Sequence, residues 1–169
     1  MDEFLASVEQ QAYRIALLAL SDHDEALDVV QDTMMKLVSN YQHRPEKEWR
    51  TLFFSILHNR ITDGHRKKTR SRRLFGWFDR SEDVDEDNAV DRVESDTALP
   101  GQALEDSESM SSIHKALSGL PLRQQEAFML RMVEGFDTNE TAKIMGCSAG
   151  SVKTHLSRAL GTLREVLEE

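Results

Sequence analysis

The stretch DTNETAKIMGCSAGSVKTHLSRALGTL, residues 137–163, predicts a short helix, a tight turn and a second helix. Thr138 is the expected N-cap of the first helix, because a threonine hydroxyl can accept a hydrogen bond from an amide of the first turn. Gly146 is expected to end that helix, since glycine readily adopts the positive φ of a helix terminus. Ser148 or Ser151 is the expected cap of the next helix.

The second helix of this stretch has two chemically different faces. Its apolar residues recur at i, i+4, i+7 and i+11 and are Val152, Leu156, Ala159 and Leu163. Its opposite face is polar and basic, with Lys153, Thr154, His155, Ser157 and Arg158. This arrangement is typical of a helix-turn-helix, whose second helix enters the DNA major groove. The alternative is a helical hairpin that only packs against the rest of the chain.

Composition and charge divide the chain into three parts. The 169 residues are 39% hydrophobic with apolar residues at helical spacing, which predicts an all-α protein. The net charge of −9 comes from one segment: residues 79–112 contain 12 acidic and 2 basic side chains, whereas 1–78 and 113–169 are nearly neutral. We therefore expect two small helical domains, 1–78 and 112–169, joined by an acidic flexible linker at 79–111. Since the acidity is local, the overall charge does not argue against nucleic-acid binding.

Two amphipathic helices are expected at the start of the chain. The first carries an apolar stripe from Phe4 to Leu18 or Ala19, and Ser21 or Asp22 is the expected cap of the second. Core-facing positions of the second helix are predicted to be Leu27, Val30, Met34, Leu37 and Val38. Its outer face carries Asp28, Gln31, Asp32 and Met35. This face is either solvated surface or a docking face for a helical partner.

A third helix is expected from about Glu46 to Lys68, after the polar loop NYQHRPEKE at 40–48. Helical periodicity buries one of Phe53 and Phe54. The polar face of the helix then carries Arg50, His58, Asn59, Arg60, Asp63 and Arg66. Six cations follow within residues 66–73, more than a helix dipole requires, so this run predicts phosphate binding.

Several function classes have no support in the sequence. No run of about 18 apolar residues occurs, so no membrane insertion is expected, and the first residues do not have the order of a secretory signal. The single cysteine cannot form an intrachain disulfide, which fits a cytoplasmic location. The histidines lack metal-ligand spacing, and no glycine-rich phosphate loop occurs. We therefore expect no catalytic residue, metal or cofactor.

Three segments together resemble one protein family. They are DEALDVVQDTMMKLV (24–38), WRTLFFSILHNRITDGHRKKTR (49–70) and the segment from ALSGLPLRQQEAF to LREVL (116–167). In this order they are similar to regions two and four of bacterial RNA polymerase sigma factors of the sigma-70 family, extracytoplasmic-function group. The run LPLRQQE at 120–126, before GFDTNETA at 135–142 and SVK at 151–153, is the most specific part.

The resemblance implies a promoter-recognition subunit of RNA polymerase. It implies that Asp28, Gln31, Asp32 and Met35 dock on the clamp helices of the largest polymerase subunit, and that the flap region is a further contact. Core polymerase and promoter DNA are the implied partners, and an anti-sigma protein is a further partner that the family offers.

The resemblance also implies which residues read DNA. The minus-ten element would be bound by the loop and third helix through Tyr41, His43, Arg44, Trp49, Asn59, Arg60, Asp63, Arg66, Lys67 and Arg70. The minus-thirty-five element would be bound as duplex by the helix-turn-helix through Ser148, Ser151, Lys153, Thr154, Ser157 and Arg158.

The chain departs from the family pattern at a few positions. Leu52 stands where the family usually has Trp, Thr141 where it has Ile, and Cys147 where it has Ile or Val. Two other functions compete with the sigma-factor reading. One is a sigma-like mimic that binds an anti-sigma protein without touching DNA, which the basic run at 66–73 disfavours. The other is a simple helix-turn-helix regulator, which leaves residues 1–78 without a role.

Overall fold

The computed structural model describes residues 1–75 and 107–168, and every regular element in these two ranges is helical. The all-α prediction is therefore confirmed. Most of the predicted acidic linker lies outside the described residues. Its last residues, 107–111, belong to a helix, because the structure begins that helix earlier than the sequence pattern indicated.

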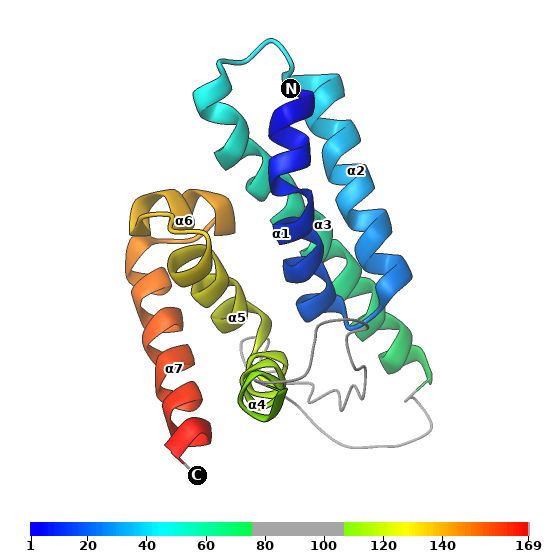
Figure 1. Ribbon diagram of the computed structural model, residues 1–169. Helices are drawn as coiled ribbons and strands as arrows, with labels where there is room; N and C mark the ends of the chain where they lie inside the picture. The colour runs from blue at the N-terminus through cyan, green and yellow to red at the C-terminus, as the bar shows by residue number, and fades with distance from the viewer. Residues whose placement is uncertain (76–106, 169) are drawn as a thin grey trace.

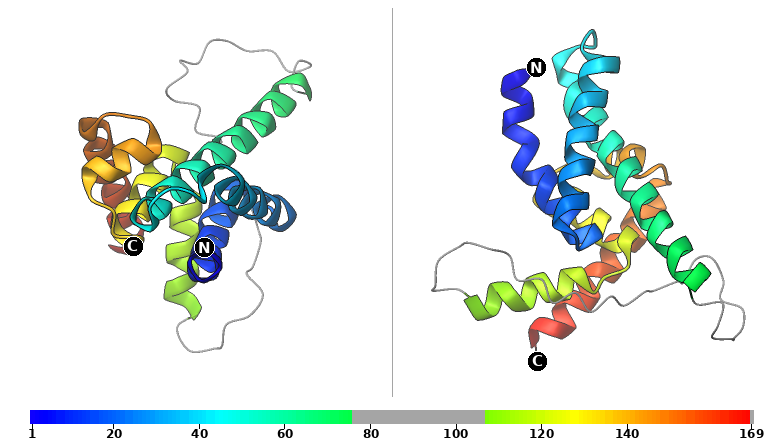
Figure 2. Two further views of the ribbon diagram at one scale, coloured as in Figure 1. Left: turned by 90° about the horizontal axis from the view of Figure 1, so that it is seen from above. Right: turned by 90° about the vertical axis from the view of Figure 1, so that its right-hand side faces the viewer.

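The helices form two modules that lie side by side (Figures 1 and 2). The N-terminal module is a bundle of α1 (Asp2–Leu20), α2 (His23–Tyr41) and α3 (Glu46–Phe75). The C-terminal module contains α4 (Ser107–Ser118), α5 (Leu122–Phe128), the π-helical turn η2 (Met129–Val133), α6 (Thr138–Met145) and α7 (Ala149–Glu168).

Tight caps set the geometry of the N-terminal bundle. Ser21 takes a left-handed conformation (φ 54°) that ends α1, and the Asp22 carboxylate accepts a 2.8 Å hydrogen bond from the Glu25 amide, which starts α2. Asp22, and not Ser21, is therefore the cap of α2. The Lys68 ammonium of α3 donates to the Leu20 carbonyl at 2.6 Å and pairs with Glu25 at 2.8 Å. These bonds fix α3 against the turn between α1 and α2.

Helix α3 differs from the expectation in its length and in its burial. It continues past Lys68 to Phe75, so the basic run at 66–73 is helical, and its 30 residues span about 45 Å. Phe53 and Phe54 are 0% and 1% exposed, so the prediction that only one of them is buried is wrong. Phe53 packs edge-on against Phe4 of α1, whereas Phe54 packs against Phe136 of the other module.

The helix-turn-helix forms as predicted, with one change of cap. Asp137, and not Thr138, caps α6, because its carboxylate accepts from the Glu140 amide at 2.8 Å. The Glu140 carboxylate accepts from the Asp137 amide at 3.0 Å, which completes a capping box. Gly146 ends α6 at φ 62°, and the Ser148 hydroxyl accepts from the Ser151 amide at 3.1 Å. The crossing of α6 and α7 therefore depends on local chemistry as well as on burial.

A single hydrophobic core crosses the boundary between the modules. Helix α3 contacts α6, and α1 contacts α4 and α5. Buried side chains from both sides form one continuous cluster, to which the bundle contributes Ile15, Phe54 and Leu57 and the C-terminal module contributes Leu130, Phe136, Ile144 and Val152. The sequence pattern predicted two cores but did not predict that they join.

Candidate nucleic-acid interface

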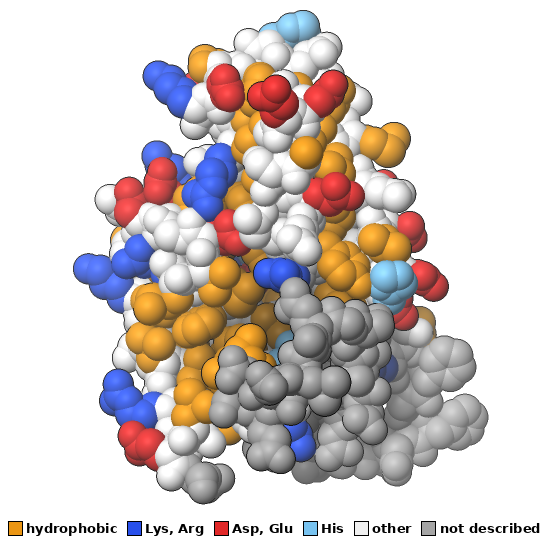
Figure 3. Space-filling view, viewed as in Figure 1, with side chains coloured by type: hydrophobic (Ala, Val, Ile, Leu, Met, Phe, Trp, Pro, Cys, Tyr) orange, Lys and Arg blue, Asp and Glu red, His pale blue; other side chains and the backbone are white. Residues whose placement is uncertain are grey.

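The outer face of α2 presents all four residues that the sequence assigned to partner docking. Asp28, Gln31, Asp32 and Met35 are exposed, while Val30, Thr33 and Leu37 on the opposite face are buried. Two residues predicted to face the core are instead exposed, Leu27 at 39% and Val38 at 36%, so this part of the prediction is wrong. This face is therefore both acidic and apolar, which suits a basic helical partner with apolar residues of its own. Acidic side chains follow the edge of α2 in Figure 3.

The loop between α2 and α3 is supported by Trp49. Its indole N–H donates to the Arg44 carbonyl at 2.9 Å, and its ring packs at 5.9 Å from that of Phe4. The Arg44 guanidinium pairs with Glu48 at 3.4 Å across the surface. Trp49 is half-buried, so in this structure it supports the loop and does not present a free stacking surface. His43 and Arg44 are exposed on the loop, and Tyr41 is half-buried at its start.

A stripe of exposed polar side chains follows α3 beyond the loop. Its members recur at i, i+4, i+7, i+8 and i+11, so they share one face of the helix: Asn59, Asp63, Arg66, Lys67 and Arg70. Arg60 lies beside the stripe but is half-buried, and its Nε has no hydrogen-bond partner. The exposed stripe is continuous with the helical basic run and can follow a nucleic-acid backbone.

Helix α7 has the orientation that the sequence predicted. Val152, Ala159 and Leu163 are buried and Leu156 is half-buried. The candidate base and phosphate contacts therefore face solvent: Lys153, Thr154, Ser157 and Arg158. Ser148 and Ser151 join their hydroxyls at 2.9 Å at the N-terminus of the helix, where backbone amides favour an anion. The Thr154 hydroxyl donates to the Gly150 carbonyl at 3.1 Å, so toward a ligand it can only accept.

Two residues assigned to the polar face of α3 instead face the C-terminal module. Arg50 donates to the Glu134 carbonyl at 2.6 Å and pairs with its carboxylate at 3.1 Å. The Arg50 guanidinium also lies 4.0 Å from the centre of the Phe136 ring. Burial raises the pKa of Glu134, and the nearby Arg50 charge opposes that rise.

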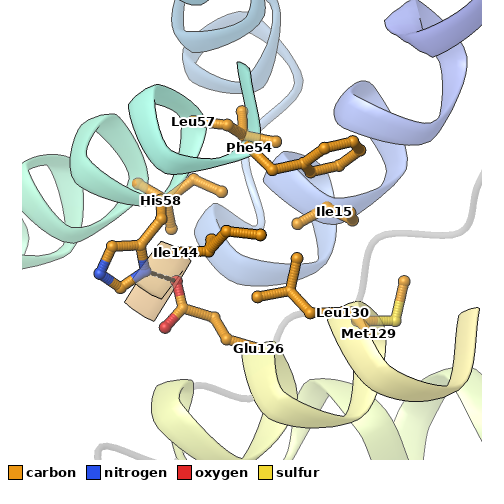
Figure 4. A pocket seen from close by; sticks show the side chains of 9 residues that line it. Ile15, Phe54, Leu57, His58, Glu126, Met129, Leu130 and Ile144 are labelled. Atoms are coloured by element: carbon orange, nitrogen blue, oxygen red, sulfur yellow. Dashed lines mark hydrogen bonds and ion pairs between the residues drawn. The ribbon is translucent and has the colours of Figure 1, made fainter. Parts of the chain in front are cut away.

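His58 forms a second polar contact between the modules (Figure 4), besides the bond that Gln125 Nε2 of α5 donates to the Leu18 carbonyl of α1 at 3.3 Å. Its Nδ1 lies 2.7 Å from Oε1 of Glu126 on α5, and both residues are buried. The other carboxylate oxygen of Glu126 has no hydrogen-bond partner. Apolar side chains from both modules surround the pair and leave a cavity of about 10 Å³, lined by Ile15, Phe54, Leu57, Ile61, Met129, Leu130 and Ile144.

Sequence reasoning missed these inter-module contacts. A usable signal was present, since Glu126 shares its helix face with Leu122, Met129 and Leu130, and His58 shares its face with Phe54 and Ile61. A charged residue inside an apolar face usually has a partner of opposite charge. The identity of that partner, 68 residues away in sequence, could not be read from the spacing.

The described residues offer little to other kinds of chemistry. Within 1–75 and 107–168, no three His, Cys, Asp or Glu side chains are grouped so that they could hold a metal ion. No helix in the same ranges has the length and apolar content to cross a membrane. Cys147 is half-buried, and burial raises the pKa of its thiol, which disfavours the reactive thiolate at neutral pH.

Comparison with known proteins finds matches to one protein family. Residues 4–71 match the family described as Sigma-70 region 2, and residues 110–163 match Sigma-70, region 4. The chain is 30% identical over 160 residues to RNA polymerase sigma factor SigV of Bacillus subtilis, covering 92% of this chain and 84% of that protein. It is also 30% identical over 168 residues to the ECF RNA polymerase sigma factor EcfG of Rhodopseudomonas palustris, covering 98% of this chain and 83% of that protein.

Two solved structures share the arrangement of both modules. One is the sigma factor RpoE of Bartonella quintana in complex with the anti-sigma factor NepR, with a TM-score of 0.72 and 28% identity over 99% of this chain and 96% of that chain. The other is CnrH in complex with the cytosolic domain of CnrY, with a TM-score of 0.62 over 99% of this chain and 86% of that chain. At 19% identity, the second likeness shows the fold alone.

Proposed function

The chain belongs to the sigma-70 family of RNA polymerase sigma factors, in its extracytoplasmic-function group, and from that premise we propose which of its surfaces perform each step of initiation. A protein of this family binds core RNA polymerase and directs it to promoters. Sigma factors are not enzymes, and the proposal assigns this chain no catalytic residue. We place its action in the cytoplasm, where core polymerase and promoter DNA meet.

The outer face of α2 is the proposed docking surface for core polymerase. Asp28 and Asp32 supply negative charge, Gln31 supplies hydrogen bonds, and the exposed Met35 supplies adaptable apolar contact. Two exposed aliphatic residues, Leu27 and Val38, extend the apolar part of this surface. A mixed surface of this kind favours both rapid encounter and a well-packed complex.

The loop at 42–45, with Tyr41 at its start, and the polar stripe of α3 are the proposed reader of the minus-ten element. Promoter opening requires pockets or stacking surfaces for extruded bases and cations for the phosphates. His43 and Arg44 are exposed on the loop, and the stripe from Asn59 to Arg70 supplies cations along the helix. Trp49 contributes by holding the loop through its bond to the Arg44 carbonyl.

Helix α7 is the proposed reader of the minus-thirty-five element, and the orientation of its polar face is the observation that carries this assignment. Lys153 and Arg158 point away from the core, so they can reach phosphates and base edges in a major groove. The hydroxyl pair at Ser148 and Ser151 lies at the helix N-terminus, where it can contact a phosphate.

Abortive transcription on two matched promoters tests this assignment. One promoter carries the upstream element, and in the other that element is scrambled. We expect Lys153→Ala and Arg158→Ala to lower activity on the intact promoter and to change it little on the scrambled one. Arg164→Ala, an exposed arginine farther along α7, is the control. Equal losses on both templates would mean that these residues support folding and do not read the element.

An anti-sigma protein is a further proposed partner. The structure that matches this chain at 28% identity was solved as a complex of a sigma factor with an anti-sigma factor. The likeness covers both modules in their mutual arrangement, which is the observation that favours such a partner. Affinity capture with this chain, followed by identification of the bound protein and inhibition of transcription in vitro, tests it. A captured protein that leaves transcription unchanged would contradict this part of the proposal.

A further inference from the structure

Helix α3 meets the turn between α1 and α2 at a compact contact near its end. At Gly64 the approach is so close that a Cβ atom would lie 3.2 Å from Cδ2 of the buried Leu20. One turn later, the Lys68 ammonium donates to the Leu20 carbonyl at 2.6 Å and pairs with the Glu25 carboxylate at 2.8 Å. We call these four residues, Leu20, Glu25, Gly64 and Lys68, the Leu20 contact.

Lys68 differs in its surroundings from the cations beside it. Arg66, Lys67 and Arg70 are exposed, whereas the Lys68 side chain is 34% exposed and its ammonium lies against two oxygens. The carbonyl belongs to the C-terminal end of α1, where the helix dipole favours a cation. Oε2 of Glu25 is buried and has no hydrogen-bond partner among the described residues, so the Lys68 charge compensates it. A phosphate could therefore bind Lys68 only by breaking both contacts.

The Leu20 contact sets the direction of the end of α3. Residues 70–74 are exposed, and this end projects away from α1 and α2 in both views of Figure 2. From Lys68 to Phe75 the helix extends about 10 Å. A tilt or rotation of α3 at Leu20 would turn the polar stripe, including Arg66 and Arg70, away from its present direction.

The same contact joins the two proposed working helices of the N-terminal module. Glu25 lies in the first turn of α2, and Asp28 and Asp32 of the proposed docking face follow it at i+3 and i+7. Once the polymerase holds α2, the angle between α2 and α3 decides where the polar stripe lies relative to the promoter. The bond between Lys68 and Glu25 fixes this angle at the end of α3.

We propose that Lys68 is a positioning residue for promoter reading, which fixes the end of α3 relative to α2 and does not itself bind DNA phosphate. The inference rests on the proposed assignment of α2 to polymerase docking and of α3 to the minus-ten element. It divides the basic run by role, since Lys67 faces solvent and Lys68 faces the protein. Glu25 then matters for promoter reading although it contacts no DNA.

Three substitutions separate positioning from phosphate binding. Lys68→Met removes the ammonium and keeps a side chain of similar shape, and Glu25→Gln removes only the negative charge of the pair. Lys67→Met removes a solvent-facing cation one residue away. Lys115→Met is the control for loss of a lysine, because Lys115 is exposed on α4, outside both proposed DNA faces. Circular dichroism of each variant reports whether the helices are retained.

Each variant is assembled with core RNA polymerase, and its binding to a promoter fragment is measured over a range of salt concentrations. Lys67→Met should reduce the slope of log affinity against log salt by about 1, because a phosphate contact is lost. Lys68→Met and Glu25→Gln should keep the slope of the parent. Both should lower abortive transcription about three- to tenfold, since bonds between charged groups are strong but are partly screened here.

Two further comparisons separate position from charge. Loss of the Glu25 carboxylate by itself favours binding to a polyanion, so a loss of transcription in Glu25→Gln reports position. The variant with both Lys68→Met and Glu25→Gln should be no worse than the weaker single variant, because the two residues act through one contact. Lys68→Arg, which keeps the charge and its donors, should restore most of the activity.

Amide hydrogen exchange of the free, full-length chain supplies a readout that needs neither polymerase nor DNA. Exchange at residues 69–75 should be about three- to tenfold faster in Lys68→Met and Glu25→Gln than in the parent, and exchange in α7 should be unchanged. Lys67→Met and Lys115→Met should exchange as the parent does. If Lys68→Met loses helix content, Glu25→Gln decides the outcome, since the Glu25 side chain is 46% exposed.

Two results would overturn the positioning role alone. One is a salt slope for Lys68→Met that falls as that of Lys67→Met does, which would make Lys68 a phosphate ligand. The other is a helical Lys68→Met or Glu25→Gln variant that matches an active parent in transcription and in exchange. A parent that supports no promoter-specific transcription would instead refute the proposed function, and the role of Lys68 in promoter reading with it.

Discussion

The capping box at the start of α6 provides a sharp test of how local chemistry stabilises the helix-turn-helix. Asp137 accepts a hydrogen bond from the Glu140 amide, and Glu140 accepts one from the Asp137 amide, so each side chain satisfies a backbone donor of the other. We predict that Asp137→Ala destabilises the protein, because the Glu140 amide loses its acceptor and the helix N-terminus loses a negative charge.

The expected size of this effect follows from its two parts. Loss of an N-cap acceptor costs about 1 kcal/mol, and loss of the charge at the helix N-terminus adds about 0.3–1 kcal/mol at low ionic strength. The sum of roughly 1–2 kcal/mol lowers the melting temperature by about 2–8 °C for a chain of this size. Asp137→Asn keeps an acceptor and loses only the charge, so it should cost no more than about 1 kcal/mol.

Thermal unfolding followed by circular dichroism measures both variants beside a control. Asn139→Ala is that control, since Asn139 is exposed in the same turn of α6 and takes part in neither bond of the box. The Asp137→Asn variant should lose stability less at high salt than at low salt, because its loss is electrostatic. A melting temperature for Asp137→Ala equal to that of Asn139→Ala would refute the reasoning.

Three further predictions concern docking, loop support and titration. Asp32→Lys should weaken binding to core polymerase without loss of helix content. Glu9→Lys, the same charge reversal on α1, is the control and should bind core polymerase as the parent does. Equal binding by the parent and Asp32→Lys in a pull-down would show that the docking face is misassigned. Trp49→Phe keeps an aromatic ring beside Phe4 but is smaller and lacks the indole donor to the Arg44 carbonyl, a hydrogen bond worth about 1 kcal/mol. It should relax selectivity among minus-ten sequences in abortive transcription while core binding stays unchanged; unaltered selectivity would contradict the role in loop support. Because burial raises the pKa of Glu134 above its ordinary value of 4.5, the folded state keeps a proton on Glu134 at pH values where the unfolded state has already lost it. Its contribution to the free energy of unfolding is thus fully present below pH 4.5 and is lost as the pH rises through the raised pKa. Urea unfolding at several pH values should show the parent losing stability relative to Glu134→Gln over that window, and a constant difference would contradict the assignment.

The elements could be predicted from the sequence because their signals are local. The apolar spacing of Val152, Leu156, Ala159 and Leu163 fixes which face of α7 is buried, and the same spacing then fixes the proposed DNA face. Gly146 marks the end of α6 through its positive φ, as expected. The cap was misassigned to Thr138 because both residues are acceptable caps, and only the backbone geometry distinguishes them.

The joining of the modules could not be predicted, because periodicity shows that a face is buried but not what covers it. Phe54 illustrates this limit. A helix with one apolar face should bury only one of two adjacent phenylalanines, but α3 is covered on two sides. Arg50 and His58 were assigned to a polar face for the same reason. Residue types that are usually solvated here meet buried carboxylates from a distant part of the chain.

Run-off transcription with purified core RNA polymerase tests the central claim most directly. Genomic fragments serve as templates, and core polymerase without this chain is the control. We expect the chain to confer initiation at defined start sites that core polymerase alone does not use, and we expect these sites to require both an upstream and a downstream element. A chain that binds core polymerase and confers no specific initiation, or that does not bind it at all, would contradict the account.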